Sequence, residues 1–184
     1  DAKCRTRLPH PFLSSLLMRV RRIVLLLAGA AALQFLFGAS RYRGAWPVDW
    51  FLIATASVAR SGDFVRAVLT GASAGLVEDG LTHELIGMNA FAKSAIGYVL
   101  ALVSVRVVLG GAWAVGAAVA IASLANDTIV AVLAYLLTQQ PIVLGSWESF
   151  ARAAASGAAA AILEAAWRFP WAEWWEKRRL RRLR

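Results

Sequence analysis

The sequence predicts an all-α integral membrane protein with a single membrane domain, built as a bundle of six transmembrane helices. Of its 184 residues, 59% are hydrophobic and only 17% are charged, and the mean hydropathy is +0.59. Soluble domains average about 45–50% apolar and about 25% charged residues. A water-soluble globule of this length leaves roughly 30% of its unfolded surface exposed, so it could not cover so much apolar side chain. Intrinsic disorder is excluded because it requires low hydrophobicity.

Six apolar segments follow one another along the chain, and a membrane-spanning helix needs about 20 mostly apolar residues. We predict spans at 23–40, 47–59, 65–81, 90–108, 112–138 and 148–167. The first is interpreted as a retained helix, because it has no clear signal-peptide cleavage site and further spans follow it. The segment 112–138 is interpreted as one long helix that ends before Pro141. The alternative is two short helices that are broken near Asn126 and Asp127.

The positive charges lie mainly at the two ends of the chain and indicate how it is oriented. Six spans place both termini on one side of the membrane. With both termini in the cytoplasm, 16 of the 20 Lys and Arg residues are inside, and only Arg41, Arg43, Lys93 and Arg152 are outside. The positive-inside rule therefore predicts an N-in, C-in topology. The net charge of +9 is explained in this way by topology, so we expect no nucleic-acid partner.

The two termini are interpreted separately from the membrane domain at 19–170. Residues 1–18 form a basic tail, interpreted as non-native or disordered because Met18 and the arginines after it resemble a natural start. At 171–184, Trp171, Trp174 and Trp175 precede a basic run. This pattern predicts an interfacial helix that anchors the protein at headgroup depth and binds anionic lipids. The alternative is a docking surface for a cytoplasmic partner.

The third span carries a face that is nearly free of side chain, because Gly71 and Gly75 form a Gly-x-x-x-Gly pair beside Ser73 and Ala74. Such a face permits close packing of helix backbones in lipid, where no hydrophobic force drives helices together. Packing within the bundle is the structural interpretation. A partner helix that docks on the same face is the functional one.

Polar residues at the end of the third span raise the question of a metal or acid–base site. Glu78, Asp79, His83 and Glu84 lie close together, and Asp79 and His83 are four residues apart. The segment does not have the spacing of a metal-binding helix, so we interpret it as a solvated acidic loop. The single cysteine, Cys4, excludes a disulfide framework and a cysteine-based metal site. No catalytic motif is present, so we predict no catalytic residues, no cofactor and no metal.

Three ionisable residues lie within predicted spans, where a charge at the bilayer centre costs about 2.5–3.5 kcal/mol on insertion scales. Lys93 lies near the outer end of its helix and is expected to snorkel or to pair with Asp79. Asp127, beside Asn126, is interpreted either as a structural hydrogen-bonding residue or as an interaction site. Glu164 is one turn before Arg168, which predicts an ion pair on one helix face.

The segment 71–98 resembles the rod shape-determining protein MreD family. It has a helix with Gly-x-x-x-Gly-Leu-x-x-Asp, a short loop, and a second helix that opens with Leu-x-Gly-x-Asn-Ala and contains Gly-Tyr. The matching residues are Gly71, Gly75, Leu76, Asp79, Gly87, Asn89, Ala90, Gly97 and Tyr98. The basic start, the first apolar helix and the short second segment from Pro47 to Gly62 are similar to that family as well.

The resemblance implies a six-helix bundle related to the substrate-binding subunits (S-components) of energy-coupling-factor (ECF) vitamin transporters. It also implies a non-enzymatic scaffold in the elongasome, which controls peptidoglycan synthesis and cell shape at the bacterial inner membrane. The implied partners are the single-pass coiled-coil protein MreC, a SEDS glycosyltransferase with a class B penicillin-binding protein, and the MreB filament. In this interpretation Gly71 and Gly75 allow close packing, and Asp79 and Asn89 fix the loop between the third and fourth helices.

Two other functions remain as alternatives. The first is the substrate-binding subunit of an ECF vitamin transporter, because Ala28 and Ala32 resemble the small-residue contact of such subunits with their membrane partner. A vitamin that co-purifies with the protein would favour it, since a binder needs an outward pocket with polar and aromatic groups. The second is a membrane enzyme with an unfamiliar site around Asp79 and His83, which no recognised motif supports.

Overall fold

The computed structural model describes residues 11–38, 48–82, 85–106, 111–139 and 146–168, and the part so described is entirely helical. It contains six α-helices, in agreement with the predicted all-α class. Their bounds are α1 Pro11–Gly38, α2 Trp50–Ala59, α3 Phe64–Thr82, α4 Met88–Arg106, α5 Ala112–Thr138 and α6 Trp147–Arg168. The three tryptophans predicted to anchor the C-terminal tail lie outside the described residues.

Most helix bounds lie within about two residues of the predicted ones, and two differences have a physical reason. Helix α1 begins at Pro11 and not at residue 23, because proline is well tolerated in the first turn of a helix and the following segment continues without a breaker. Helix α2 begins later than predicted, after Asp49, whose Oδ1 accepts a hydrogen bond from the backbone N–H of Leu52 at 2.8 Å. Asp49 therefore acts as an N-cap.

Helix α5 is continuous through Asn126 and Asp127, so the prediction of one long helix is confirmed and the alternative of two short helices is wrong. Its C-cap, Gln139, has a left-handed backbone with φ of 57°, and its N–H donates to the carbonyl of Tyr135. A left-handed residue after the last turn is a common way to end a helix, because it satisfies a terminal carbonyl group.

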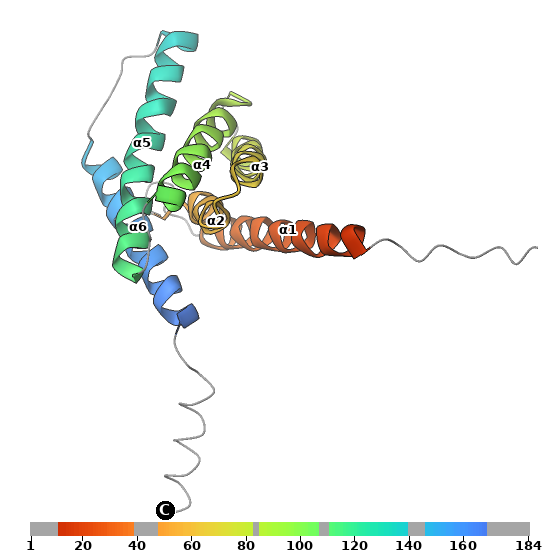
Figure 1. Cartoon of the computed structure of the whole chain (residues 1–184). Helices are drawn as coiled ribbons and strands as arrows, with labels where there is room; N and C mark the ends of the chain where they lie inside the picture. Colours follow the sequence, from red (N-terminus) through yellow and green to blue (C-terminus); the bar gives the residue numbers. More distant parts are fainter. Residues whose placement is uncertain (1–10, 39–47, 83–84, 107–110, 140–145, 169–184) are drawn as a thin grey trace, which may run out of the picture.

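The helices form two tightly packed pairs, α3 with α4 and α5 with α6, and the short α2 lies between the pairs (Figure 1). The first part of α1 projects away from the rest of the molecule, whereas the segment around Ala30 packs against α2 and α3 (Figure 1). The main core is made by apolar side chains from α2, α3, α4, α5 and α6, among them Leu52, Ala67, Leu100, Val119 and Ala160.

Two of the described helices, α4 and α5, are long and apolar enough to cross a membrane by length and composition. Helix α2 is apolar but has only ten residues. Many large apolar side chains on the outer faces are exposed, including Val65, Leu69, Phe91, Ile121 and Leu136. These features are compatible with a membrane protein.

Candidate functional site

The α3–α4 pair is a hairpin whose backbones touch at three glycines. A Cβ added at Gly71 would lie 2.3 Å from the carbonyl oxygen of Lys93, and one at Gly75 would lie 2.3 Å from the backbone nitrogen of Ala90. At Gly97 it would lie 2.6 Å from the carbonyl oxygen of Ala67. Because real Cβ atoms essentially never approach so closely, only glycine fits at these positions. The predicted role of Gly71 and Gly75 in packing within the bundle is confirmed, and α4 of the same chain covers their face.

Asp79 lies at the end of this hairpin where α3 connects to α4. Its carboxylate is buried and accepts three hydrogen bonds, from the backbone N–H of Gly87 at 2.7 Å and from the backbone N–H and side-chain Nδ2 of Asn89 at 3.2 and 2.9 Å. Gly87 has φ of +105°, a conformation that side chains of L-residues rarely adopt and glycine adopts readily. The expectation that Asp79 and Asn89 fix this loop is therefore confirmed.

The interpretation of the acidic residues as a solvated loop was wrong for Glu78 and Asp79. Helix α3 continues to Thr82, so both residues lie on a helix that faces α4 and not in a loop. Asp79 is only 1% exposed. His83 and Glu84 lie outside the described residues.

Lys93 lies at the centre of a buried charge cluster, which we define as Asp49, Glu78 and Lys93. Its ammonium group is 2.6 Å from Oδ2 of Asp49 and 2.8 Å from Oε2 of Glu78, and its side chain is fully buried. The expectation that Lys93 snorkels or pairs with Asp79 was wrong, because α2 brings Asp49 against α4 and the ammonium group turns inward. Asp49 and Glu78 were not predicted as its partners, because no local spacing relates Asp49 to Lys93.

The charge cluster joins four helices. Asp49 precedes α2, Glu78 is on α3 and Lys93 is on α4, and the backbone N–H of Asp49 donates to Oγ of Ser156 on α6 at 2.9 Å. Buried charges are costly unless they are paired in good geometry, so a cluster of this kind favours one arrangement of the helices over others. The arrangement therefore specifies how α2, α3, α4 and α6 align.

The other predicted polar residues, Asn126, Asp127 and Tyr98, are not part of the charge cluster. Asp127 Oδ1 is 3.4 Å from the Arg152 guanidinium on α6, while its Oδ2 and the buried Oδ1 of Asn126 accept no hydrogen bond from the described residues. Tyr98 is 49% exposed, and its ring centroid lies 5.5 Å from that of Phe64. Tyr98 therefore lies on the outer surface of the hairpin.

A second ion cluster, which we call the arginine clamp, consists of Arg60, Glu164 and Arg168. Glu164 is 8% exposed, and its Oε1 accepts from Nε of Arg168 at 2.6 Å, which confirms the predicted pair. Its other carboxylate oxygen accepts from Nη1 of Arg60 at the end of α2. Sequence spacing could not reveal Arg60, because it is 104 residues away from Glu164.

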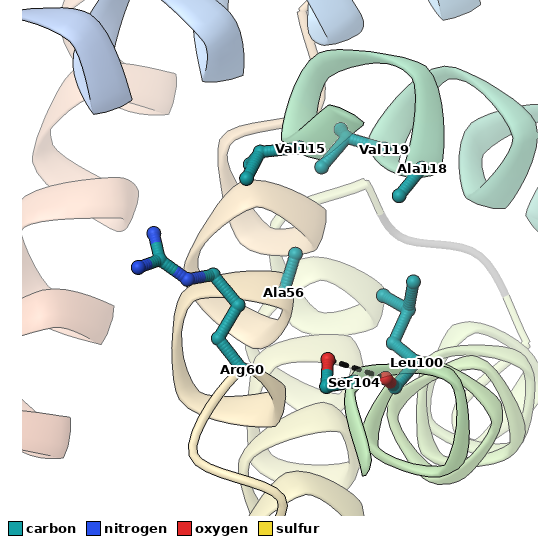
Figure 2. A pocket seen from close by; sticks show the side chains of 7 residues that line it. All are labelled: Ala56, Arg60, Leu100, Ser104, Val115, Ala118 and Val119. Atoms are coloured by element: carbon teal, nitrogen blue, oxygen red, sulfur yellow. Dashed lines mark hydrogen bonds between the residues drawn. The ribbon is translucent and has the colours of Figure 1, made fainter. Parts of the chain in front are cut away.

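A small pocket lies between α2, α4 and α5 beside the arginine clamp (Figure 2). Its lining side chains are almost all apolar, and the hydroxyl of Ser104 donates to the carbonyl of Leu100 at 2.8 Å. The lining residues are Ala56, Arg60, Leu100, Ser104, Val115, Ala118 and Val119.

The polar residues of the hairpin and of the charge cluster have a structural role. Lys93 and Asp79 are buried and bonded to groups of the same chain, so they hold the helices together. Among the described residues, no group of three or more His, Cys, Asp and Glu side chains is arranged to hold a metal ion. No protein-family model, no curated protein and no solved structure matches this chain.

Proposed function

We propose that this protein is a multi-pass membrane protein of the bacterial inner membrane that acts as a non-enzymatic scaffold subunit of the rod complex. One observation carries the proposal. Six of the residues that match the MreD family pattern shape a single structural unit, the α3–α4 hairpin. They are Gly71, Gly75, Asp79, Gly87, Asn89 and Gly97. A function that depends on a precisely shaped helix pair and on no reactive group fits a protein that works by binding other proteins.

The membrane setting is supported by the apolar outer faces and by the placement of the basic residues. Arg60 ends α2, Arg168 ends α6, and both contact Glu164, so these two helices end at the same side of the molecule. Arg60 and Ser104 line one pocket, which places the end of α4 there as well. Three basic helix ends on one side suit a cytoplasmic face under the positive-inside rule, and hence an N-in, C-in topology.

The proposed partners are an MreC-type single-pass protein, a SEDS glycosyltransferase with its class B penicillin-binding protein, and the MreB filament. Since α4 covers the glycine face of α3, these partners would bind outer faces of the bundle. The outer face of the hairpin, with Leu69, Phe91 and Val99 exposed, is available to a membrane helix. The aromatic and branched side chains there would give van der Waals contacts, on which helix association in lipid depends.

The test is affinity purification of the tagged protein from its own membranes in mild detergent, followed by mass spectrometry. We expect to recover a single-pass coiled-coil protein together with wall synthases. Recovery of paired ATPases with a large transmembrane coupling subunit would contradict the proposal and identify the substrate-binding subunit of an energy-coupling-factor transporter.

A matched pair of variants links the hairpin to this function. Gly75→Leu pushes the α3 and α4 backbones apart, so we expect loss of the complex and rounded cells. Gly80→Leu places the same side chain on the same helix where a Cβ would meet nothing within 4 Å, so the complex and rod shape should persist. Normal complex recovery and normal cell shape with Gly75→Leu would refute the scaffold role of the hairpin.

A further inference from the structure

Three tryptophans on α5 and α6 are almost fully exposed. The structure describes four tryptophans, of which Trp113, Trp147 and Trp167 are 88%, 83% and 88% exposed, whereas Trp50 packs against the core. Tryptophan is highly buried on average in folded proteins, because its ring is large and mostly apolar. The three exposed side chains therefore require surroundings that accept an apolar ring and an indole N–H at the same time.

The two tryptophans of α6 mark its two ends. Trp147 is the first residue of the helix, and Trp167 lies 20 residues later, next to the last residue, Arg168. At a rise of about 1.5 Å per residue, these two positions are about 30 Å apart along the helix axis. The hydrocarbon core of a typical bilayer is about 30 Å thick as well.

Trp113 lies at the same end of the α5–α6 pair as Trp167. Helices α5 and α6 pack against each other in opposite directions (Figure 1). A Cβ at Gly116, three residues after Trp113, would lie 2.9 Å from Cβ of Ala161, which is six residues before Trp167. The exposed indoles therefore form two groups, with Trp113 and Trp167 at one end of the pair and Trp147 at the other.

The charged residues of α6 lie near the same two ends. Each end carries one acidic and one basic residue, Glu148 with Arg152 and Glu164 with Arg168, and residues 153–163 between them are uncharged. A helix of this kind can place its centre in hydrocarbon, because long basic side chains near its ends reach the interfaces. This distribution is compatible with a membrane span, although hydropathy singles out only α4 and α5 among the described helices.

We propose that the three exposed tryptophans bind the headgroup regions of a lipid bilayer, Trp113 and Trp167 in one leaflet and Trp147 in the other. Indoles favour this depth, because the ring contacts acyl chains while the N–H donates to oxygens of headgroups or water. The α5–α6 pair is thereby held at a fixed depth in a bilayer whose hydrocarbon core is about 30 Å thick. This inference rests on the membrane location under the proposed function and on no protein partner.

The distribution of the indoles favours lipid over a protein partner. Tryptophans that dominate binding in a protein interface cluster near the centre of one contact patch. Here nearly the whole length of α6 separates Trp147 from Trp167. The large side chains exposed between the two ends include Ile121 on α5 and Ile162 on α6, which are apolar. Indoles at both ends with apolar side chains between them match the two interfaces and the interior of a bilayer.

The experiment is fluorine NMR of the full chain, labelled with fluorotryptophan and reconstituted in lipid nanodiscs. Each signal is assigned by its loss in a single variant, Trp113→Phe, Trp147→Phe or Trp167→Phe. A gadolinium chelate carried on lipid headgroups broadens signals at headgroup depth, whereas dissolved oxygen broadens signals near the bilayer centre. The matched control is Ile121→Trp, which adds an indole at an exposed position about 12 Å further along α5 than Trp113.

We expect the gadolinium lipid to broaden the three native signals several times more than the signal of Ile121→Trp, and oxygen to act in the reverse order. Oxygen broadening at Trp147 or Trp167 as strong as in Ile121→Trp would overturn the proposal. Signals that neither reagent broadens would place the indoles in a protein contact and overturn it too. Equal gadolinium broadening at all positions, without an effect of oxygen, would place the helix pair on the bilayer surface, with the same consequence.

A second measurement tests whether these tryptophans set the depth. Thermal unfolding is followed in nanodiscs whose lipids differ only in acyl-chain length, and we expect the highest unfolding temperature at a hydrocarbon thickness of about 30 Å. The double variant Trp147→Leu/Trp167→Leu should lose this maximum, because leucine has no N–H. Phe150→Leu, at an exposed aromatic residue of α6 without a polar group, is the control and should retain it. A maximum that persists in the double variant would contradict the proposal. Because no other protein is present, both outcomes are separate from the recovery of rod-complex proteins.

Discussion

At position 93 an ammonium group lies in the interior of the molecule, held between the carboxylates of Asp49 and Glu78. The two carboxylates therefore share this one ammonium group. Breaking a buried ion pair by removing one partner leaves a charge without compensation and costs about 3–5 kcal/mol, far more than breaking a surface pair. At position 93 the charge of the side chain, and not its shape, therefore determines whether the fold is stable.

We expect Lys93→Met to destabilise the protein by about 3–5 kcal/mol, because the partly buried carboxylates of Asp49 and Glu78 lose their cation. The measurement is chemical or thermal unfolding in a fixed detergent. Arg66→Gln breaks a partly exposed surface pair with Asp63 and should cost at most about 1 kcal/mol. The triple variant Lys93→Met/Asp49→Asn/Glu78→Gln removes every charge and should be more stable than Lys93→Met alone; the opposite order would contradict this account.

We expect Asp79→Asn to loosen the α3–α4 loop. A carboxamide has only one acceptor oxygen, so it cannot serve both Gly87 and Asn89, and a lost buried hydrogen bond costs about 1–3 kcal/mol. Amide hydrogen exchange at Gly87 is the direct measurement and should become faster. Asp63→Asn, at a partly exposed carboxylate, serves as the control and should leave exchange at Gly87 unchanged.

The contacts of individual side chains were the feature that the sequence predicted least well. The spacing of Glu164 and Arg168 predicts their ion pair, because residues four positions apart on a helix lie on the same face. The partners of Lys93 and Glu164 across the bundle, Asp49 and Arg60, lie 44 and 104 residues away, and only the packing of α2 against α4 and α6 brings them together. A sequence pattern carries no information on such a contact.

At the scale of helices, each of the two helix pairs is held together by a close backbone contact at glycine. Gly75 on α3 abuts the backbone of α4, and on the other pair Gly116 and Gly157 face each other reciprocally. A Cβ at Gly116 would lie 2.8 Å from the carbonyl oxygen of Gly157, and one at Gly157 would lie 2.7 Å from that of Gly116. Small residues at both contacts let the backbones approach closely, which is how helices associate in lipid.

We expect Gly75→Ala to destabilise the hairpin by about 1–3 kcal/mol, because the added methyl group meets backbone atoms that cannot turn away. Gly80→Ala, on the same helix but with open space around it, should stabilise by about 0.5–1 kcal/mol through the better helix propensity of alanine. Unfolding of both variants in one detergent checks the sign. Equal effects would mean that the close contact does not matter.

Helices were the most predictable level, for a reason that the α5 helix makes clear. Its 27 residues form an apolar run without a glycine or proline break near Asp127, so the run itself indicates one helix. The start of α1 was predicted too late, because residues 1–18 were interpreted as a tail and the first span was begun after Arg19, Arg21 and Arg22, although nothing in this sequence breaks a helix. The glycines of the α3–α4 hairpin could be identified by spacing, whereas the contact between Gly116 and Gly157 was hidden in alanine-rich surroundings.

At the scale of the whole molecule, the basic ends of α2, α4 and α6 imply a sidedness that can be measured. We expect Ser61→Cys, in the exposed turn between α2 and α3, to react with a membrane-impermeant thiol reagent only from the cytoplasmic side. Ile86→Cys, in the exposed loop between α3 and α4, should react only from the outside. Both are made in a Cys4→Ser background, and labelling of Ser61→Cys from outside would reverse the topology.

The shortness of α2 has a consequence for the lipid bilayer itself. Ten residues rise about 15 Å, half of the roughly 30 Å of hydrocarbon in a typical membrane. In the proposed orientation, with Arg60 at the cytoplasmic surface, the N-cap Asp49 would lie inside the bilayer and not at its outer surface, together with the ammonium group of Lys93 that it contacts. A bilayer responds to such a short element by thinning or by admitting water above it. In the proposed setting the protein would therefore deform the membrane on its outer side, and assemblies around it would sit in a locally thinner bilayer.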